Sequence, residues 1–365
     1  MSFKYGLKKT INASGRMTIL GVSTLSEAVL EGISFGGSHY FEMDDLYKRS
    51  GEIVANHCET ESAMITNSAS AAVTLAVAGL ITKDDSYAVE HLHKEAPKRA
   101  NEIILMKGHN VDYGAPIETM VRLGGGVVKE VGYANGCKVD QILHAISNET
   151  VGVLYVQSHH CVQKNMPTLE TVYRVCREKN IPLVVDAAAE EGLIGFTDKS
   201  DLVIFSGSKA IEGPSSGILA GKQNLISYAV AHRAYIGRAM KVGKETVFGL
   251  LAALDEYGNK TISLAKQKDV LKHFDPLNRL DGVKVEHTYD PAGREIVRAR
   301  VHIDGGQAKM SAVQLVDAFK KGNTPIYTRD YHANEGHFDL DPRPLLKGDA
   351  ELIVQRFNEL WEGNK

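Results

Sequence analysis

The sequence predicts an α/β protein with a mostly parallel sheet flanked by helices, followed by a small α+β domain. Six short apolar runs are each followed by small or polar residues and, usually, by a helical pattern. Parallel strands buried on both faces have this near-continuous apolar character, and the alternation implies right-handed crossovers. The predicted strands are Ala63–Thr66, Glu102–Met106, Val127–Val131, Val153–Val156, Pro182–Val185 and Leu202–Phe205.

The 365 residues are enough for two or three domains, and the pattern suggests where they divide. Residues 1–45 are rich in glycine and polar residues, without a long periodic element, and we expect them to wrap the body or a neighbouring subunit. Residues 46–256 form the predicted large domain, and residues 257–365 the small C-terminal domain. In the small domain we expect strands at 283–286 and 297–303 and helices near 311–320 and 350–362, after a helical connector at 250–272.

Composition and charge exclude several classes of partner. The chain has 42 Lys and Arg against 45 Asp and Glu, a net charge of −3, which offers no global field for nucleic acid or an anionic membrane. Its four cysteines form no C-x-x-C pair, no secretory signal opens the chain, and the weakly polar stretch Ala69–Ile81 is too short for a bilayer. We therefore expect a cytoplasmic protein whose partner is a small molecule.

Two neighbouring strands of the predicted sheet end in residues that suit pyridoxal phosphate. Asp186 follows the run Pro182–Val185, and Lys209 follows Leu202–Phe205 through a Ser/Gly turn, 23 residues further on. Ligands of such sheets bind beyond the carboxyl ends of the strands. The lysine would form a Schiff base with the cofactor, and the aspartate would keep the pyridine nitrogen protonated so that the ring accepts electrons. The alternative is a surface lysine and a helix-capping aspartate.

The turn after the first strand is a candidate phosphate site. Small residues there let backbone N–H groups approach an anion at the start of an apolar helix, whose N-terminus favours negative charge. Ordinary N-capping by Asn67 or Ser68 is the alternative. The predicted phosphate-binding residues are Asn67, Ser68, Ala69 and Ser70, with hydroxyl groups from Ser206 and Ser208.

Residues after two other strands are candidates for the cofactor ring. His109 follows Glu102–Met106 and is predicted to stack on the pyridine, with a solvated loop histidine as the alternative. Ser158 and His159 follow Val153–Val156, where a partner for the ring hydroxyl is expected. We predict no metal site, because adjacent residues on an extended chain point to opposite faces and neither the His-His-Cys run at 159–161 nor the histidines at 91 and 93 find further ligands.

A local basic run lies shortly after the candidate lysine. Residues 232–244 contain four formal cations and no acid, which is compatible with a site for a carboxylate or phosphate of the substrate, or with a solvated face. Two further arginines are candidates for the same role, with surface ion pairs as the alternative. The predicted substrate-binding residues are Arg16, Arg233, Arg238, Lys241, Lys244 and Arg329.

Taken together, these motifs resemble the fold-type I, aspartate aminotransferase-like pyridoxal phosphate enzymes. More narrowly, they resemble the group related to bacterial selenocysteine synthase, and the resemblance extends over most of the chain. The motifs that carry it are Ile11–Thr18, Val185–Ala189, Asp201–Lys209 with Gly213-Pro214, Ile236–Glu245, Tyr331–Asn334 and Asp341–Leu345.

The resemblance implies an ammonia-lyase acting on a phosphorylated amino sugar acid, in a homo-oligomer. The expected reaction converts D-glucosaminate 6-phosphate to 2-keto-3-deoxy-6-phosphogluconate and ammonia, with Lys209 removing the Cα proton. Three alternatives stay open: a transferase on aminoacyl-tRNA, another pyridoxal phosphate lyase or aldolase on a different amino acid, and a catalytically silent cofactor-binding protein. The net charge and the absence of a long basic N-terminal arm argue against an RNA partner.

Overall fold

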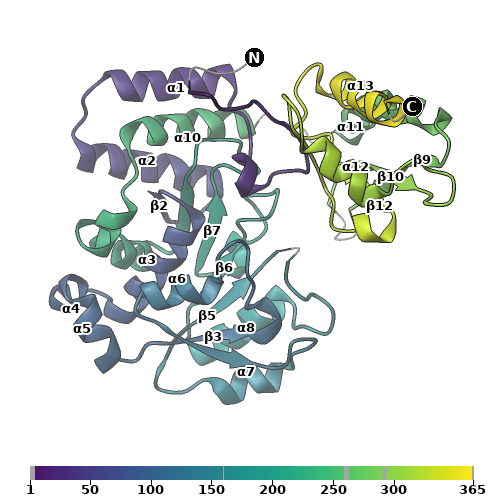
Figure 1. Cartoon of the computed structure of the whole chain (residues 1–365). Helices are drawn as coiled ribbons and strands as arrows, with labels where there is room; N and C mark the ends of the chain where they lie inside the picture. Colours follow the sequence, from purple (N-terminus) through teal and green to yellow (C-terminus); the bar gives the residue numbers. More distant parts are fainter. Residues whose placement is uncertain (1–4, 159, 259–262, 291–293, 364–365) are drawn as a thin grey trace. The chain divides into compact units, whose positions relative to one another are not determined.

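The computed structural model describes residues 5–158, 160–258, 263–290 and 294–363. The chain forms two compact units (Figure 1). The larger unit is Leu25–Asn259, and the smaller unit combines Met1–Thr24 with Lys260–Lys365.

A seven-stranded sheet is the centre of the larger unit. Its strand order is β2-β8-β7-β6-β5-β3-β4, and every strand except β8 runs in the same direction. The predicted α/β class and all six predicted strands are confirmed. The strands are β2 Ser62–Thr66, β3 Glu102–Met106, β4 Val127–Val131, β5 Thr150–Val156, β6 Leu183–Asp186, β7 Leu202–Ser206 and β8 Gly217–Gly221.

Helices cover both faces of this sheet, which explains the apolar character of its strands. Along β3, Ile104 packs into the core on one face, and Ile103 and Leu105 pack into the core on the other. The first face is covered by α2 Met43–Cys58, α7 Val139–Ala145, α8 Leu169–Lys179 and α10 Lys244–Tyr257, and the second by α3 Ala69–Thr82, α6 Ile117–Leu123 and α9 Gln223–Ala231. Two short helices, α4 Ser86–Glu90 and α5 Leu92–Glu95, follow α3.

One expectation about the N-terminal residues is wrong, because a regular helix, α1 (Glu27–Ser38), lies where no long periodic element was expected. Ser26 caps the helix by accepting the N–H of Val29. Its glycines lower helix propensity and hide the pattern. They are needed for packing, since a Cβ on Gly32 or Gly36 would lie 2.9 or 2.8 Å from a backbone oxygen of the segment 244–248 in α10.

The smaller unit has an antiparallel sheet in the order β12-β10-β9, as the alternating pattern predicts. Its strands are β9 Val283–Tyr289, β10 Val297–Ile303 and β12 His337–Leu340, and a separate parallel pair joins β1 Ile11–Ala13 to β11 Ile326–Thr328. Its helices are α11 Leu264–Leu271, α12 Ala312–Phe319 and α13 Asp349–Glu362.

The core of the smaller unit is aromatic, with Phe319 against Phe338 and Phe357. Among the described residues, no helix combines the length and apolar composition that a bilayer crossing requires.

A substitution at Gly217 tests how closely β8 approaches the start of α3. A Cβ at this position would collide with the backbone of Ser68 at the start of α3, so we expect Gly217→Ala to lower the free energy of unfolding by about 1–3 kcal/mol, the usual cost of overpacking. Urea denaturation measures this. Gly37→Ala is the control, because its Cβ would meet no atom within 4 Å, and its stability should be unchanged or slightly higher. Equal stability of the two variants would contradict the close approach.

Candidate active site

The candidate cofactor residues lie at one edge of the large sheet. β2, β3, β5, β6 and β7 run parallel, so their carboxyl ends meet at the same edge. Asp186 is the last residue of β6, and its register partner on β7 is Ile204, two residues before Ser206. The turn that carries Lys209 follows directly, and it is closed by a hydrogen bond from the Gly207 N–H to the Ser216 carbonyl (2.9 Å).

Asp186 is a buried ionisable group, and Lys209 is a half-buried one. Burial raises the pKa of the Asp186 carboxyl, which the hydrogen bond from the Ala188 N–H (3.0 Å) and the charge of Lys209 oppose. Burial lowers the pKa of the Lys209 amine, which the charge of Asp186 opposes. Within the described part of the chain, neither forms an ion pair. The two groups thus influence each other while their polar atoms stay available to a ligand.

The turn after β2 combines an N-cap with an open helix N-terminus that suits an anion. Ser68 caps α3, because its hydroxyl accepts the N–H of Ala71 (3.1 Å), and it donates to the side-chain oxygen of Asn67 (3.0 Å). The predicted N-capping of α3 by Ser68 is therefore present. It leaves the first N–H groups of α3, those of Ala69 and Ser70, at the open end of the helix, where an anion is favoured.

Tyr113 is a site residue that the sequence analysis missed. Its hydroxyl lies 3.2 Å from that of Ser70, and Asp186 is close enough to act on its pKa, which burial raises. The signal was available, since Tyr113 lies in the same loop after β3 as His109. However, the position of Tyr113 in the loop does not show which way its side chain points.

His109 is fully buried and neutral. Its Nδ1 accepts the N–H of Val156 (3.3 Å), so the proton resides on Nε2, and burial lowers the pKa of the ring to about 4. The ring meets Tyr155 edge to face at 4.7 Å. Its Nε2 has no hydrogen-bond partner among the described residues, and the ring is fully enclosed by protein, so its stacking on the cofactor stays a prediction.

The other predicted cofactor residues have these positions. Ser158 is buried and turns the loop after β5, because its hydroxyl accepts the N–H of His160 (3.2 Å). His159 lies outside the described residues. The hydroxyls of Ser206 and Ser208 are 3.3 Å apart at the end of β7. Cys161 is buried with its pKa raised to about 12, so its thiol stays protonated and is a poor metal ligand.

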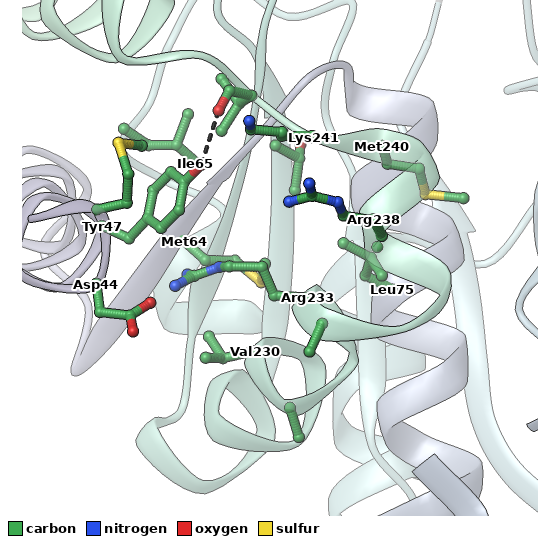
Figure 2. Close-up of a pocket in the computed structure, with 16 residues that line it drawn as sticks. Asp44, Tyr47, Met64, Ile65, Leu75, Val230, Arg233, Arg238, Met240 and Lys241 are labelled. Atoms are coloured by element: carbon green, nitrogen blue, oxygen red, sulfur yellow. Dashed lines mark hydrogen bonds between the residues drawn. The ribbon is translucent and has the colours of Figure 1, made fainter. Parts of the chain in front are cut away.

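A cavity of about 590 Å³ lies beside β2 and gathers three of the predicted substrate-binding cations (Figure 2). They are Arg233 in the short helix His232–Ala234, Arg238 in Ile236–Met240, and Lys241. Thr66 also lines this cavity, and it directly precedes the candidate phosphate turn. The cavity therefore adjoins the segment that the cofactor phosphate would occupy.

Helix α2 supplies the opposite wall of the cavity, which the sequence analysis did not anticipate. The Arg233 guanidinium lies 4.3 Å from the centre of the Tyr47 ring, and the Tyr47 hydroxyl donates to the carbonyl of Val242 (2.8 Å). Burial lowers the pKa of Arg233, and the nearby Asp44 opposes this. A desolvated guanidinium held on an aromatic ring is a strong binding group for an anion.

Three other predicted substrate-binding residues have different surroundings. The Lys244 ammonium donates to the carbonyls of Gly36 (2.6 Å) and Gly37 (2.9 Å), at the C-terminal end of α1, where cations are stabilising. Arg329 is half-buried in the smaller unit, with its guanidinium 5.0 Å from the Tyr331 ring and with no carboxylate partner among the described residues. Arg16, also in the smaller unit, is half-buried.

Comparison with known proteins identifies the family. A family model described as beta-eliminating lyase matches residues 21–297. D-glucosaminate-6-phosphate ammonia lyase of Salmonella typhimurium is 40% identical over 360 residues, which covers 98% of this chain and 96% of the relative. The chain belongs to the beta-eliminating lyase family. The predicted fold-type I class and the resemblance are thereby confirmed.

Two further proteins are similar to this chain over nearly its full length. A solved structure of D-glucosaminate-6-phosphate ammonia-lyase has a TM-score of 0.93 at 39% identity, covering 99% of this chain and 97% of that one. A Streptomyces protein, 5'-C-glycyluridine monooxygenase-decarboxylase, is 32% identical and covers 97% of this chain and 90% of its own length.

Pyridoxal phosphate is the cofactor of this lyase fold, and the residues present fit it. A buried carboxylate and a half-buried lysine, neither with an ion-pair partner among the described residues, are the groups that such a cofactor would satisfy. Asp186 would hold the ring nitrogen, Lys209 the aldehyde carbon, and the N-terminus of α3 the phosphate.

Replacing Lys209 tests the assignment directly. We expect Lys209→Ala to lose the visible absorbance band of bound cofactor and to lose turnover by at least about 10²–10⁴-fold, the share of a general base alone. Absorbance spectra and steady-state rates measure both. Lys199→Ala is the matched control, since Lys199 is half-exposed and lies near Asp198, and it should change neither. A Lys209→Ala protein that kept both the band and full activity would refute the assignment.

Proposed function

We propose that this lyase converts D-glucosaminate 6-phosphate to 2-keto-3-deoxy-6-phosphogluconate and ammonia. The observation that carries the proposal is the near-full-length match, at 40% identity, to an enzyme named for ammonia loss from this substrate. The reaction balances without an oxidant, because the water lost from C2 and C3 is returned when the imine is hydrolysed to the ketone and ammonia.

The chain's own residues supply the proton transfers. When bound, pyridoxal phosphate supplies an electron sink for the electron pair left at Cα. Lys209 is the group that takes the Cα proton, and its lowered pKa keeps a larger fraction of the amine unprotonated for this step. Asp186, which is buried, would hold a proton at the ring nitrogen of the bound cofactor.

The cavity beside β2 is the proposed site for an anionic group of the substrate. Arg233, Arg238 and Lys241 line it, and one acidic side chain, Asp44, faces them. A phosphate accepts several charge-assisted hydrogen bonds and suits this excess of cations. Arg329 is a further candidate for the carboxylate, supported by its lack of a carboxylate partner among the described residues.

A second candidate is another pyridoxal phosphate reaction on a different amino acid. The 32% identity to the Streptomyces monooxygenase-decarboxylase supports it, because the family accommodates more than ammonia loss. The residues that would bind the cofactor are compatible with either reaction, so the two reactions differ in which substrate the residues of the cavity bind.

A homo-oligomer and a cytoplasmic location also belong to this proposal. They are supported by exposed Leu30 and Phe35 on α1 and by four buried, unpaired cysteines.

The reaction is tested by product release. We expect the cofactor-saturated protein to release equal amounts of 2-keto acid and ammonia from D-glucosaminate 6-phosphate, measured by a coupled assay for each product. Unphosphorylated D-glucosaminate is the control substrate and should require a much higher concentration. No release of either product from the phosphorylated substrate would contradict the proposal, and turnover of another amino acid would then favour the second candidate.

The role of the cavity is tested at Arg238. A hydrogen bond to a charged group contributes about 1.5–3 kcal/mol, so we expect Arg238→Gln to raise KM for the phosphorylated substrate by about 10–100-fold with little change in kcat. KM for D-glucosaminate should change little. Arg49→Gln is the control, because Arg49 lies exposed on α2 beside Asp45 and Glu52.

Lys244→Met completes this comparison. Its contacts with the carbonyls of Gly36 and Gly37 predict a lower stability and an unchanged KM. A raised KM with unchanged stability would instead place Lys244 with the substrate, as the basic run suggests, and an unchanged KM in Arg238→Gln would remove the cavity from the proposal.

A further inference from the structure

A cluster of histidines and glutamates lies on the smaller unit and takes no part in the proposed reaction. His332, Glu335 and His337 surround the turn that leads into β12, and their ligand atoms all lie within 4.8 Å of one another. These residues are distinct from the histidines at 91, 93, 159 and 160, for which no metal site is predicted. Their spacing, H-x-x-E-x-H, matches none of the metal motifs weighed from the sequence.

We propose that His332, Glu335 and His337 bind one divalent transition metal ion, with Zn²⁺ as the best match. Two imidazoles and one carboxylate are a ligand set that zinc uses when a fourth position stays open. Softer thiolate ligands are absent from the cluster, and the oxygen-only sets that Ca²⁺ and Mg²⁺ prefer are not present either.

The backbone of the turn holds the three side chains together. The His337 N–H donates to the His332 carbonyl (3.3 Å), and Gly336 adopts a left-handed conformation (φ 86°) that closes the turn. The two imidazole rings are stacked, with centroids 5.1 Å apart. Two ligand atoms of a tetrahedral zinc ion lie about 3.4 Å apart, given bonds of about 2.1 Å, so modest side-chain rotations suffice.

His302 lies beside the cluster but outside the three-residue ligand set. It lies on β10 directly opposite His337 in the register, and their ring centroids are 5.4 Å apart. Its Nε2 contacts Glu286 on β9 at 3.0 Å, which resembles the carboxylate support that metal-bound histidines receive. A metal bound by the three residues would join the turn at 332–336 to the start of β12.

The charges around the cluster permit a cation. Arg300 acts unfavourably on His337, but its guanidinium forms two hydrogen bonds with Asp339, at 2.8 and 3.2 Å, which offset its charge. Lys284 is likewise engaged by Glu286 at 2.8 Å. In the structure, the Nδ1–H of His332 donates to Glu335 (3.0 Å), and a metal ion would replace this proton between the same two atoms.

The test titrates metal into the full-length holoenzyme after dialysis against a chelator. We expect one equivalent of Zn²⁺ to bind and to raise the melting temperature, since a ligand of the folded state alone stabilises it. In His332→Ala/His337→Ala the dissociation constant should rise at least tenfold, and Glu335→Gln should give a smaller increase. Both variants change half-buried or exposed side chains, so the fold should be retained, which circular dichroism verifies.

The matched control removes two histidines elsewhere. His91→Ala/His93→Ala should bind Zn²⁺ as the parent does, and the four buried cysteines do not compete. Co²⁺ is the spectroscopic probe, because its visible absorption reports imidazole and carboxylate ligands in a tetrahedral site. Failure of the parent protein to bind one equivalent, or an equal loss of affinity in both double variants, would overturn the proposal.

Discussion

Two partly desolvated groups of opposite charge, Asp186 and Lys209, lie at one sheet edge, and the candidate site depends on them. Asp186 and Lys209 are each opposed by desolvation, and each is supported by the charge of the other. Because neither has an ion-pair partner among the described residues, the pair is best satisfied by a group bound between them. Pyridoxal phosphate, with a basic nitrogen and an aldehyde at separate positions of one ring, meets this requirement.

The antiparallel strand β8 connects the two ends of the cofactor site. Lys209 lies in the connection from β7 to β8, and β8 pairs on its other side with β2, which ends at the candidate phosphate turn. Gly217 brings the start of β8 against Ser68, where a side chain would not fit. The lysine turn and the N-terminus of α3 are therefore positioned by a single strand, and a shift of that strand would move both.

Much of this was predictable because parallel strands have a strong sequence signature. The strand ends at Asp186 and Lys209 could be identified without coordinates, since the carboxyl edge of such a sheet is fixed by topology. Strand β8 was missed because it begins and ends in glycine, a residue depleted in strands. Tyr113 and Tyr47 were missed because a loop or helix position does not specify which way an aromatic side chain points. The histidine cluster lies within residues 332–337, and it depends on the turn closed at Gly336, whose geometry the residue spacing alone does not show.

The charge pattern of residues 232–244 likewise does not show which of its cations lie at one site. Four cations within twelve residues, 233–244, suggest one anion site, but Lys244 is engaged by the carbonyl end of α1. The other three face a cavity in which Arg233 is held by the Tyr47 ring and partly desolvated. Such an arginine attracts an anion more strongly than the exposed Arg238 and Lys241 do, because water screens it less. We therefore expect Arg233 to contribute most to binding an anionic group of the substrate, with Arg238 and Lys241 contributing to the same anion.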